Sequence, residues 1–281
     1  MKELSSHDFE NFVNSNEETN LKNIILKDVT KDNSHIENVE FLDCRIQENS
    51  WSKCKVNNIN FCNCHLLYVN FENSILESIN FEESSVLKCN FDNCKFGENS
   101  QSQCSALFDK CSFKAINDNG SMAFIDSKFI KCNFEKATME KVELTESIFI
   151  NSIFYETIIK ESGFTLVNFI RLEAEDSEFY DGNFQNSNFV DCKIENCNFE
   201  SADFEDVNIK DSEFIECDFK KSYFKNCFIK NTNFIECDFT GIDLKAINFS
   251  EVTFEDCIID KDSFTKNQLQ NIEIEKFLDK S

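Results

Sequence analysis

The chain has 281 residues, of which 52 are Asp or Glu and 28 are Lys or Arg, so its formal net charge is −24. Such a charge disfavours nucleic acids and anionic membranes as direct partners and favours a protein with a basic surface, although acidity also serves solubility alone. The 32 phenylalanines stand beside one tryptophan and no proline, which indicates a core built from one repeated side chain.

The first twenty residues, MKELSSHDFENFVNSNEETN, are polar and lack the apolar segment of a secretory signal. No run in the chain reaches the roughly 18 apolar residues of a membrane helix. Fifteen cysteines without a signal indicate reduced thiols, so we expect a cytoplasmic location. We predict that residues 1–20 form an N-terminal cap, with Phe9 and Phe12 covering the first repeat.

From residue 21 onward, a large apolar residue recurs at every fifth position, which we call the centre. Between Phe124 and Phe264 the 29 centres are 20 Phe, eight Ile, Leu or Met, and one Ala, Ala174. Residues 21–96 follow the same rule in another phase, with Lys31 as the single polar exception. The residue two before each centre, which we call the small position, is mostly Ser, Cys, Ala or Thr.

A period of five fits neither an α-helix nor an ordinary β-strand. It fits a chain that turns a corner every five residues and points the centre and the small position inward. Four such sides make a twenty-residue coil, and the hexapeptide FIECDF indeed occurs twice, at 214–219 and 234–239. Where the centre shrinks to Ala174, the small position grows to Leu172, which keeps the core volume nearly constant.

Segments such as CNFES and ADFED, at Cys197–Asp206, resemble the pentapeptide-repeat proteins. The consensus of that family is a small residue, Asp or Asn, Leu or Phe, and two variable residues. The resemblance covers residues 21–264 and implies an all-β solenoid, a right-handed quadrilateral β-helix of about twelve coils, with short terminal caps.

The five-residue register slips twice inside this domain. Phe96 and Phe108 are twelve residues apart, and Phe113 and Phe124 are eleven apart. We therefore predict an irregular joint near residues 97–121, with interruptions in GENSQSQ (97–103) and INDNG (116–120). The segment CKFGENSQSQCSALF (94–108) resembles the first projecting loop of the Qnr quinolone-resistance proteins, and this implies partner contacts from Gly97, Glu98, Asn99 and Gln101.

Residues 265–281 leave the repeat. Thr265 is a suitable helix cap, and Leu269, Ile272 and Phe277 follow at helical spacing, so we predict a C-terminal helix that caps the last coil. In the Qnr-like and MfpA-like members such a segment joins two copies. The resemblance therefore implies a homodimer through the C-terminal segment as the alternative to a monomer.

The residue types that carry catalysis or bind metals show no constellation. Thirteen cysteines occupy small positions, Cys62 is outward and Cys104 is unassigned. A ladder of parallel thiols does not converge on a metal ion and suits disulfides poorly, so we interpret these cysteines as buried fillers. The three histidines lack ligand spacing, and a regular solenoid offers no cleft for paired carboxylates. We expect no enzymatic activity, no metal and no cofactor.

Acidic residues recur on the outer surface at the coil spacing. One outward position reads, every twenty residues, Glu156, Asp176, Asn196, Glu216, Glu236 and Asp256. Asp218 and Asp238 form a second pair with the same spacing. Since like charges about 5 Å apart repel by roughly 1 kcal/mol even in water, such rows do not favour folding. Either they are solvated positions of an acidic protein whose surface also carries lysines, or they bind a partner.

Two functions remain. The first is a DNA mimic: about twelve coils extend roughly 58 Å, over which B-DNA carries about 34 phosphates, the same order as the charge of this chain. DNA mimicry has been proposed for members of the family, and DNA gyrase or topoisomerase IV is then the candidate partner, with quinolone resistance as the result. The alternative is a pentapeptide-repeat scaffold that binds an unknown protein.

Overall fold

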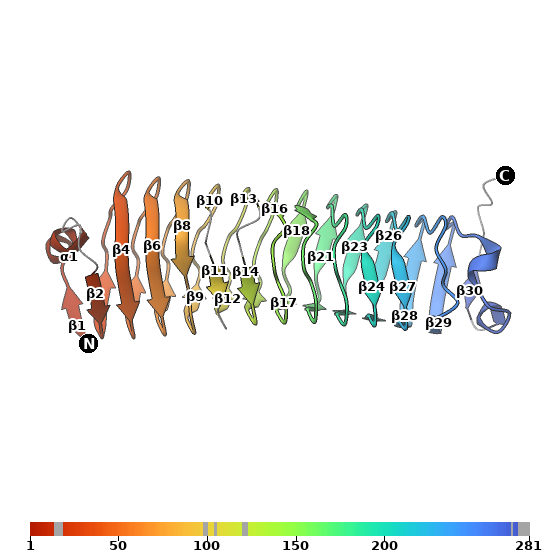
Figure 1. The fold of residues 1–281 in the computed structure, drawn as a ribbon. Helices are drawn as coiled ribbons and strands as arrows, with labels where there is room; N and C mark the ends of the chain where they lie inside the picture. The colour runs from red at the N-terminus through yellow and green to blue at the C-terminus, as the bar shows by residue number, and fades with distance from the viewer. Residues whose placement is uncertain (14–18, 98–100, 104–105, 120–122, 271, 275–281) are drawn as a thin grey trace. The chain divides into compact units, whose positions relative to one another are not determined.

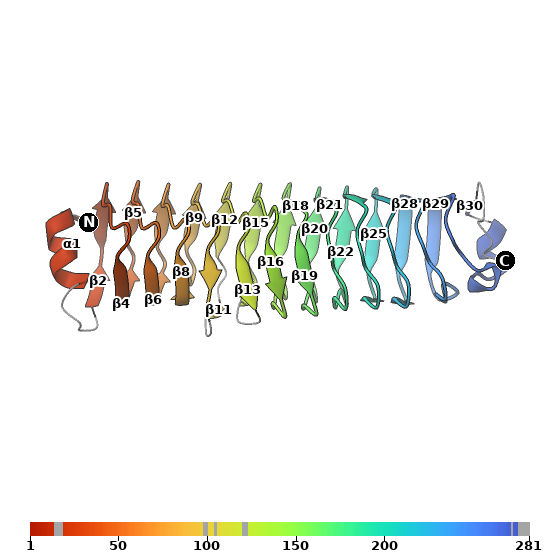
Figure 2. The same ribbon diagram turned by 90° about the horizontal axis from the view of Figure 1, so that it is seen from above.

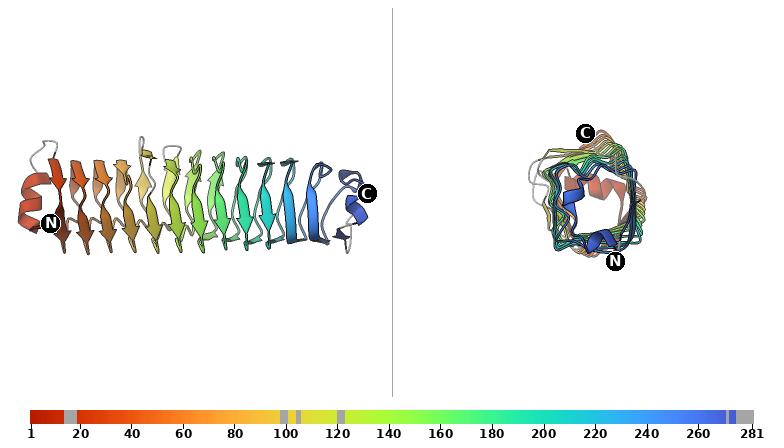
Figure 3. Two further views of the ribbon diagram at one scale, coloured as in Figure 1. Left: turned by 90° about the horizontal axis from the view of Figure 1, so that it is seen from below. Right: turned by 90° about the vertical axis from the view of Figure 1, so that its right-hand side faces the viewer.

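The computed structural model describes residues 1–13, 19–97, 101–103, 106–119, 123–270 and 272–274. They form coils of short parallel β-strands, and end-on the coils are four-sided (Figure 3). The expected all-β solenoid is thus confirmed. The chain divides into two compact units, unit 1 at Met1–Glu143 and unit 2 at Leu144–Ser281.

Unit 1 begins with strand β1 (Lys2–Leu4) and helix α1 (Ser6–Val13). β1 pairs in parallel with β3 (Ile24–Lys27), so the first residues already extend a side of the coil, which the sequence did not indicate. Helix α1 lies at the end of the coils of unit 1 (Figure 2). Its Phe9 is buried and lies on the indole of Trp51, with ring centroids 5.9 Å apart. Phe12, the other expected core contact, is 40% exposed.

Lys31 is the polar exception among the centres, and the helix explains it. Its Nζ lies 3.0 Å from the carboxylate of Glu10 in α1. Lys31 belongs to the first complete coil, beside the cap, so its charge is paired by the helix.

The strands of unit 1 stack in two main columns (Figure 1). One column consists of β2 (Thr19–Lys22), β4 (His35–Leu42), β6 (Lys55–Cys62), β8 (Ile75–Asn80), β10 (Lys95–Phe96), β13 (Asn117–Asn119) and β16 (Thr138–Glu140). The other consists of β1, β3, β5 (Arg45–Gln47), β7 (His65–Leu67), β9 (Ser85–Leu87), β12 (Leu107–Asp109) and β15 (Lys128–Ile130). A separate pair is β11 (Gln101–Gln103) with β14 (Ala123–Ile125).

The offset between paired strands changes at both register slips. Ile75 pairs with Lys95 twenty residues on, Lys95 pairs with Asn117, and Asn117 pairs with Thr138. The offset thus rises to 22 and then falls to 21 residues. Ser102 pairs with Phe124, so Ser102 occupies a centre position. It is six residues after the centre Phe96 and six residues before the centre Phe108. The spacing of twelve residues is therefore two intervals of six residues, each one residue longer than the usual five. Residues 98–100, 104–105 and 120–122 lie outside the described residues.

Unit 2 keeps an offset of twenty residues in every described pairing. Its first side consists of β17 (Ile148–Ile150), β20 (Asn168–Ile170), β22 (Asn188–Val190), β25 (Asn208–Lys210) and the first halves of β28 (Phe228–Ile235) and β29 (Asn248–Glu255). Its second side consists of β18 (Ile153–Tyr155), β21 (Glu173–Glu175), β23 (Lys193–Glu195), β26 (Glu213–Ile215) and the second halves of β28 and β29.

The third and fourth sides of unit 2 are held mainly by single bridges. The third contains β19 (Ile158–Lys160) and the bridges that join Glu178, Asn198, Asp218 and Asp238. The fourth contains β24 (Asp203–Glu205) and β27 (Tyr223–Lys225). Corners separate the four sides, and the outward residues of each corner form the columns discussed below.

The core of unit 2 is a set of phenylalanine columns. Along one column, from Phe164 through Phe184 and Phe204 to Phe224, successive ring centroids are 4.6, 5.1 and 4.7 Å apart and the planes are within 7° of parallel. Rings of neighbouring columns meet near edge-on, as between Phe184 and Phe199 at 62°. Both geometries are favourable for aromatic pairs, which explains why one side chain can fill so many centres.

The C-terminal segment differs from the expected helix. Thr265 does cap a turn, since its Oγ1 accepts a hydrogen bond from the Gln268 amide at 3.2 Å. That turn, η2 (Gln268–Gln270), is short, and β30 (Glu273–Ile274) then pairs with β29. The last coil leaves unpaired backbone groups, and a strand satisfies them where a helix would not. Residues 275–281 lie outside the described residues, and the homodimer stays a prediction.

The exchange at Leu172 and Ala174 gives a test of the core. Both side chains are buried, and Ala174 lies in register between Phe154 and Ile194. We expect A174F to lower the free energy of unfolding by about 1–3 kcal/mol, because phenylalanine overpacks against Leu172. The double variant L172S/A174F, which restores the usual pattern, should recover most of this loss in urea unfolding. Equal losses in both variants would contradict the compensation.

Candidate functional site

The small positions do more than fill space. Cys217, Cys237 and Cys257 each direct their thiol to the carbonyl oxygen of the centre 23 residues earlier, at 3.6, 3.4 and 3.2 Å. Ser222 makes the same bond with its hydroxyl, to the carbonyl of Phe199, at 2.8 Å. The Ser and Cys content of the repeat thus reflects a donor that satisfies a buried carbonyl, a role that the sequence interpretation missed.

The cysteines are otherwise as expected. The fourteen described cysteines are all free, and all but the half-buried Cys62 are buried. Burial raises the pKa of the Cys192 and Cys227 thiols to about 11. Within the described residues, no group of His, Cys, Asp or Glu is arranged to hold a metal ion. Cys104 lies outside the described residues.

The predicted outward row forms one column at a corner of unit 2. Its backbone is left-handed throughout, with φ between 49° and 53° for Glu156, Asp176, Asn196, Glu216, Glu236 and Asp256. The corner amides of Asn196, Glu216 and Glu236 each donate to a carbonyl of the next coil at 2.8 Å. The column is therefore held by the backbone, and its side chains are free to differ from coil to coil.

Charge is distributed unevenly over the four corners of unit 2. The acidic corner, between the second and third sides, comprises residues 155–158, 175–178, 195–198, 215–218, 235–238 and 255–258. It contains eleven Asp or Glu and no Lys or Arg. The other three corners start at residues 145–148, 150–153 and 160–163 and repeat every twenty residues. Their net charges are −1, −1 and −3. The candidate acids of unit 2 therefore share one corner, and this corner carries most of the net negative charge of the unit.

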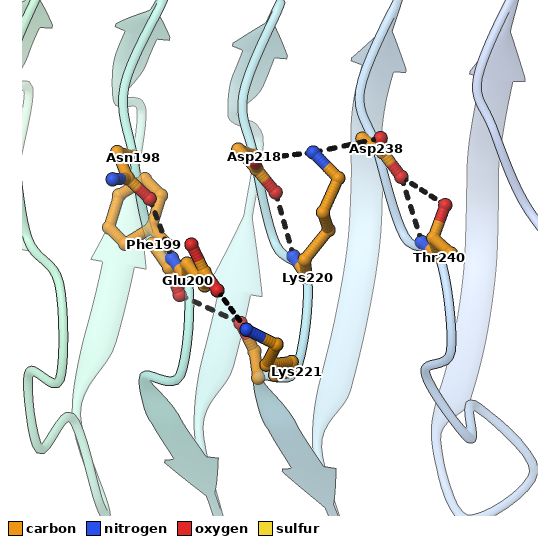
Figure 4. A network of polar contacts seen from close by, with 9 residues as sticks. Asn198, Phe199, Glu200, Asp218, Lys220, Lys221, Asp238 and Thr240 are labelled. Carbon is orange, nitrogen blue, oxygen red and sulfur yellow. Dashed lines mark hydrogen bonds and ion pairs between the residues drawn. The ribbon is translucent and has the colours of Figure 1, made fainter.

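Lysines pair with some of these acids from the bordering sides. Lys220 Nζ lies 2.6 Å from Asp218 Oδ2 and 3.1 Å from Asp238 Oδ2, so it bridges two coils (Figure 4). Lys160 pairs with Glu178 of the next coil at 2.6 Å, and Lys193 pairs with Glu195 of the same strand at 3.0 Å. Lys220 thus compensates the charges of Asp218 and Asp238. For this pair, the expectation that stacked acids do not favour folding was wrong.

Asp218 and Asp238 also shape the backbone. The Oδ1 of Asp218 accepts from the amide of Lys220 at 2.8 Å, and the Oδ1 of Asp238 accepts from the amide of Thr240 at 2.9 Å. Asn198 does the same for Glu200, at 2.8 Å (Figure 4). This local turn bond explains the Asp or Asn that precedes many of the centres. These two acids thus contribute to folding, which removes them from the strongest candidates for partner binding.

Glu216 and Glu236 remain the strongest candidates. Both are exposed, and no hydrogen bond or ion pair to either side chain is found within the described residues. Asp176 differs, because its Oδ1 accepts a hydrogen bond from Asn196 at 2.6 Å. At the first coil, a hydrogen bond to Glu156 and the nearby acidic charges raise the pKa of Tyr155, which reflects a negative potential at this corner.

The loop candidates belong to unit 1. The Gly97 amide donates to the Leu76 carbonyl at 2.9 Å, and a Cβ on Gly97 would lie 2.5 Å from the Glu77 side chain. Glycine therefore allows the close approach of two coils at that point. Gln101 lies in β11, and Glu98 and Asn99 lie outside the described residues. No contact role for this loop follows from the geometry.

Comparison with known families agrees with this architecture. A model described as "Pentapeptide repeat region" matches residues 207–278, and one described as "Pentapeptide repeats (8 copies)" matches 175–211 and 183–220. Residues 175–278 are thus similar to the pentapeptide-repeat family. The family models match within unit 2, and the same five-residue geometry continues through the described coils of unit 1. No curated protein matches the sequence.

Several solved structures resemble this chain weakly. HetL from the cyanobacterium Nostoc sp. strain PCC 7120, a pentapeptide-repeat protein involved in heterocyst differentiation regulation, is 11% identical over 89% of this chain and 96% of its own, with a TM-score of 0.27. A trypsin-treated variant of QnrB1, a plasmid-mediated fluoroquinolone resistance protein, is 16% identical over 88% and 91%, with a TM-score of 0.30. The alginate lyase AlyGC is 10% identical over 94% and 52%, with a TM-score of 0.35. These scores are too low to support an argument.

None of the helices in the described residues is long and apolar enough to span a membrane.

Thiol reactivity tests the inward orientation of the cysteines. We expect iodoacetamide to modify Cys62 first among the described cysteines of the native protein, because the others are buried. Desolvation and the charges of Glu82 and Glu83 raise the pKa of Cys62, so its labelling should accelerate as the pH rises above 8. Peptide mass spectrometry identifies the modified residues, with C62S as the control. Early labelling of Cys192 or Cys227 would contradict the fold.

The structural role of Asp238 is tested separately. We expect D238A to lower the free energy of unfolding by about 1 kcal/mol, because the Thr240 amide loses its acceptor. D238N retains that acceptor and should lose less. Denaturant unfolding measures both, and E255A, which removes an exposed acid of the same corner, serves as the control. A loss in E255A as large as in D238A would argue against the turn bond.

Proposed function

We propose that this protein acts without catalysis, by presenting the acidic corner of unit 2 to a protein that normally binds DNA. The observation that supports this most is the concentration of eleven acids and no base on one of four corners. The fold alone does not require it, since the other corners have the same backbone with nearly balanced charge. A basic surface would gain from contact with this corner and little from the others.

The spacing of charges at the acidic corner resembles that of a DNA strand. Its six coils span five steps of about 4.8 Å, or about 24 Å, and one strand of B-DNA carries about seven phosphates over that length. Of the eleven acids, the four at Glu178, Glu195, Asp218 and Asp238 are paired with lysines. Seven acids remain, a number close to the count of phosphates.

The finer proposal names a type II topoisomerase, DNA gyrase or topoisomerase IV, as the partner, and quinolone resistance as the consequence. It is supported by the acidic corner and by the resemblance of residues 94–108 to a Qnr loop. Such a role places the protein in the bacterial cytoplasm, where thiols stay reduced. Direct binding to DNA or to an anionic membrane is not part of this proposal, because the field of the acidic corner repels both.

A second candidate is a scaffold for a partner without a DNA-binding surface. It is favoured by the first coil of unit 2, where outward positions hold Ile148, Ile150, Ile153 and Ile158. Apolar residues on an outer surface are typical of protein contacts. Under this proposal a partner would be bound without strong salt dependence.

Replacing Glu216 and Glu236 with asparagine tests the first proposal. Asparagine tolerates left-handed backbone better than glutamate does, and the change removes two like charges, so E216N/E236N should fold at least as stably as the wild type. We expect its affinity for purified gyrase to fall about tenfold at low salt, because rim charges that face a basic surface are lost. Wild-type binding should weaken steeply between 50 and 300 mM KCl.

The matched control is E146N/E251N, which makes the same change at left-handed positions of two other corners, with φ of 60° and 57°. It should bind gyrase like the wild type. A supercoiling assay with and without a quinolone then reports protection. Equal loss in both variants, or binding that is insensitive to salt, would overturn the DNA-mimic proposal and favour the scaffold.

A further inference from the structure

A hollow of about 190 Å³ opens on the outer surface of three strands of unit 2, β18, β21 and β23. Its floor includes the main chain at Phe154 and Ala174, whose side chains are buried in the core. Its walls are two rows of outward side chains. These are Ile153, Glu173 and Lys193 on one side and Tyr155, Glu175 and Glu195 on the other.

Strand register sets the order of groups along the hollow. Ile153 pairs with Glu173 and Tyr155 with Glu175, so each wall passes from an apolar residue to an acid. On the next strand Lys193 and Glu195 follow, and their charged ends are paired at 3.0 Å. The hollow is therefore apolar at one end, doubly acidic in the middle and closed by an ion pair at the other end.

The two middle acids are available to a ligand. Glu173 and Glu175 are exposed, and no hydrogen bond or ion pair to their side chains is found within the described residues. With the Lys193–Glu195 pair neutral, the hollow has a net charge of −2. A neighbouring hollow over Asn151, Arg171 and Asp191 shares Ile153, Glu173 and Lys193 but has balanced charges. Of these two hollows, the first therefore has the negative charge that would favour a cation.

We propose that this hollow receives the side chain of an arginine from the protein partner. The aliphatic stem would lie on Ile153 and the ring of Tyr155, and the guanidinium would reach Glu173 and Glu175. Ile153 is 38% exposed, so covering it contributes an apolar gain as well. The order of groups in the hollow matches the order of groups in an arginine side chain, apolar first and cationic at the end.

Arginine fits these walls better than lysine does. Its planar guanidinium stacks on an aromatic ring and donates two parallel hydrogen bonds to one carboxylate, whereas an ammonium is a compact, strongly hydrated charge. Buried arginines are also frequent anchors of protein interfaces. The hollow borders the acidic corner, because Tyr155, Glu175 and Glu195 belong to both. The inference thus rests on the proposed function and deepens it by naming the side chain that anchors the partner.

A small probe tests the hollow without any partner protein. N-acetyl-arginine amide is titrated into the full chain labelled with ¹³C at isoleucine methyl groups, and the Ile153 resonance is followed by NMR. We expect a saturable shift, with citrulline amide, the uncharged isostere, giving none in the same range. N-acetyl-lysine amide should bind at least threefold more weakly. The double variant E173Q/E175Q should weaken arginine binding at least fivefold.

The matched control is E213Q/E255Q, which removes two acids of the same side of unit 2 outside the hollow. It should bind the arginine probe like the wild type. The proposal is overturned if the Ile153 resonance does not move or if citrulline binds as well as arginine. It is also overturned if lysine equals arginine, or if the control loses as much affinity as E173Q/E175Q.

The two proposals can fail separately. If gyrase binding responds to E216N/E236N but not to E173Q/E175Q, the acidic corner is retained as the docking surface and the arginine anchor is wrong. If the hollow binds arginine amide while gyrase binding is absent, the anchor is supported and the topoisomerase is not its partner. Circular dichroism of the glutamate variants in these binding experiments confirms folding, which is expected because each substituted glutamate is outward.

Discussion

Parallel hydrogen bonding between residues twenty apart is the constraint on which the rest of this structure depends. It is the reason that a centre always lies on a centre, so that phenylalanine rings of successive coils meet at about 5 Å, as Phe164 and Phe184 do at 4.6 Å. The same register stacks the small positions, whose hydroxyl and thiol groups bind carbonyls of the preceding coil. It also aligns the outward residues, although nothing in the core demands which residues these are. The fold therefore constrains the residues that point inward and leaves the outward residues free to vary.

This separation explains how the acidic corner arises. The backbone amides of Glu216 and Glu236 donate hydrogen bonds to the next coil, so the fold does not depend on their side chains. Asp218 and Asp238 lie beside them and carry the same charge, yet they close local turns and bind Lys220. Two kinds of acid thus alternate on one surface, and only their hydrogen bonds distinguish them. A count of charges alone would treat them alike.

Much of the fold was predictable from periodicity, because a period of five with one apolar class has few geometric solutions. Burial confirms the inward set, and strand pairing in unit 2 confirms the coil length of twenty residues. The pairing offset also changes at both register slips. At residues 268–270 and 273–274 the structure has a short turn and a strand where we predicted a helix, because the spacing of Leu269 and Ile272 is also compatible with a turn followed by a strand on an open ladder. The hydrogen bonds of the small positions were missed because the sequence does not show whether a cysteine only fills space or also donates a hydrogen bond. The hollow at Ile153 and Glu175 could not be predicted from the sequence either, because it depends on which outward residues lie side by side.

The duplicated hexapeptide shows what a constant register permits. Because pairing partners in unit 2 are always twenty residues apart, a segment of twenty residues such as 215–234 is a complete module with matching ends. Copying it once would add one coil and would place a new glutamate between Glu216 and Glu236. The acidic corner can therefore lengthen by gene duplication in discrete steps, each adding about 4.8 Å and its own charges. The reach of such a surface is then measured in whole coils, and matching a partner's length becomes a matter of copy number.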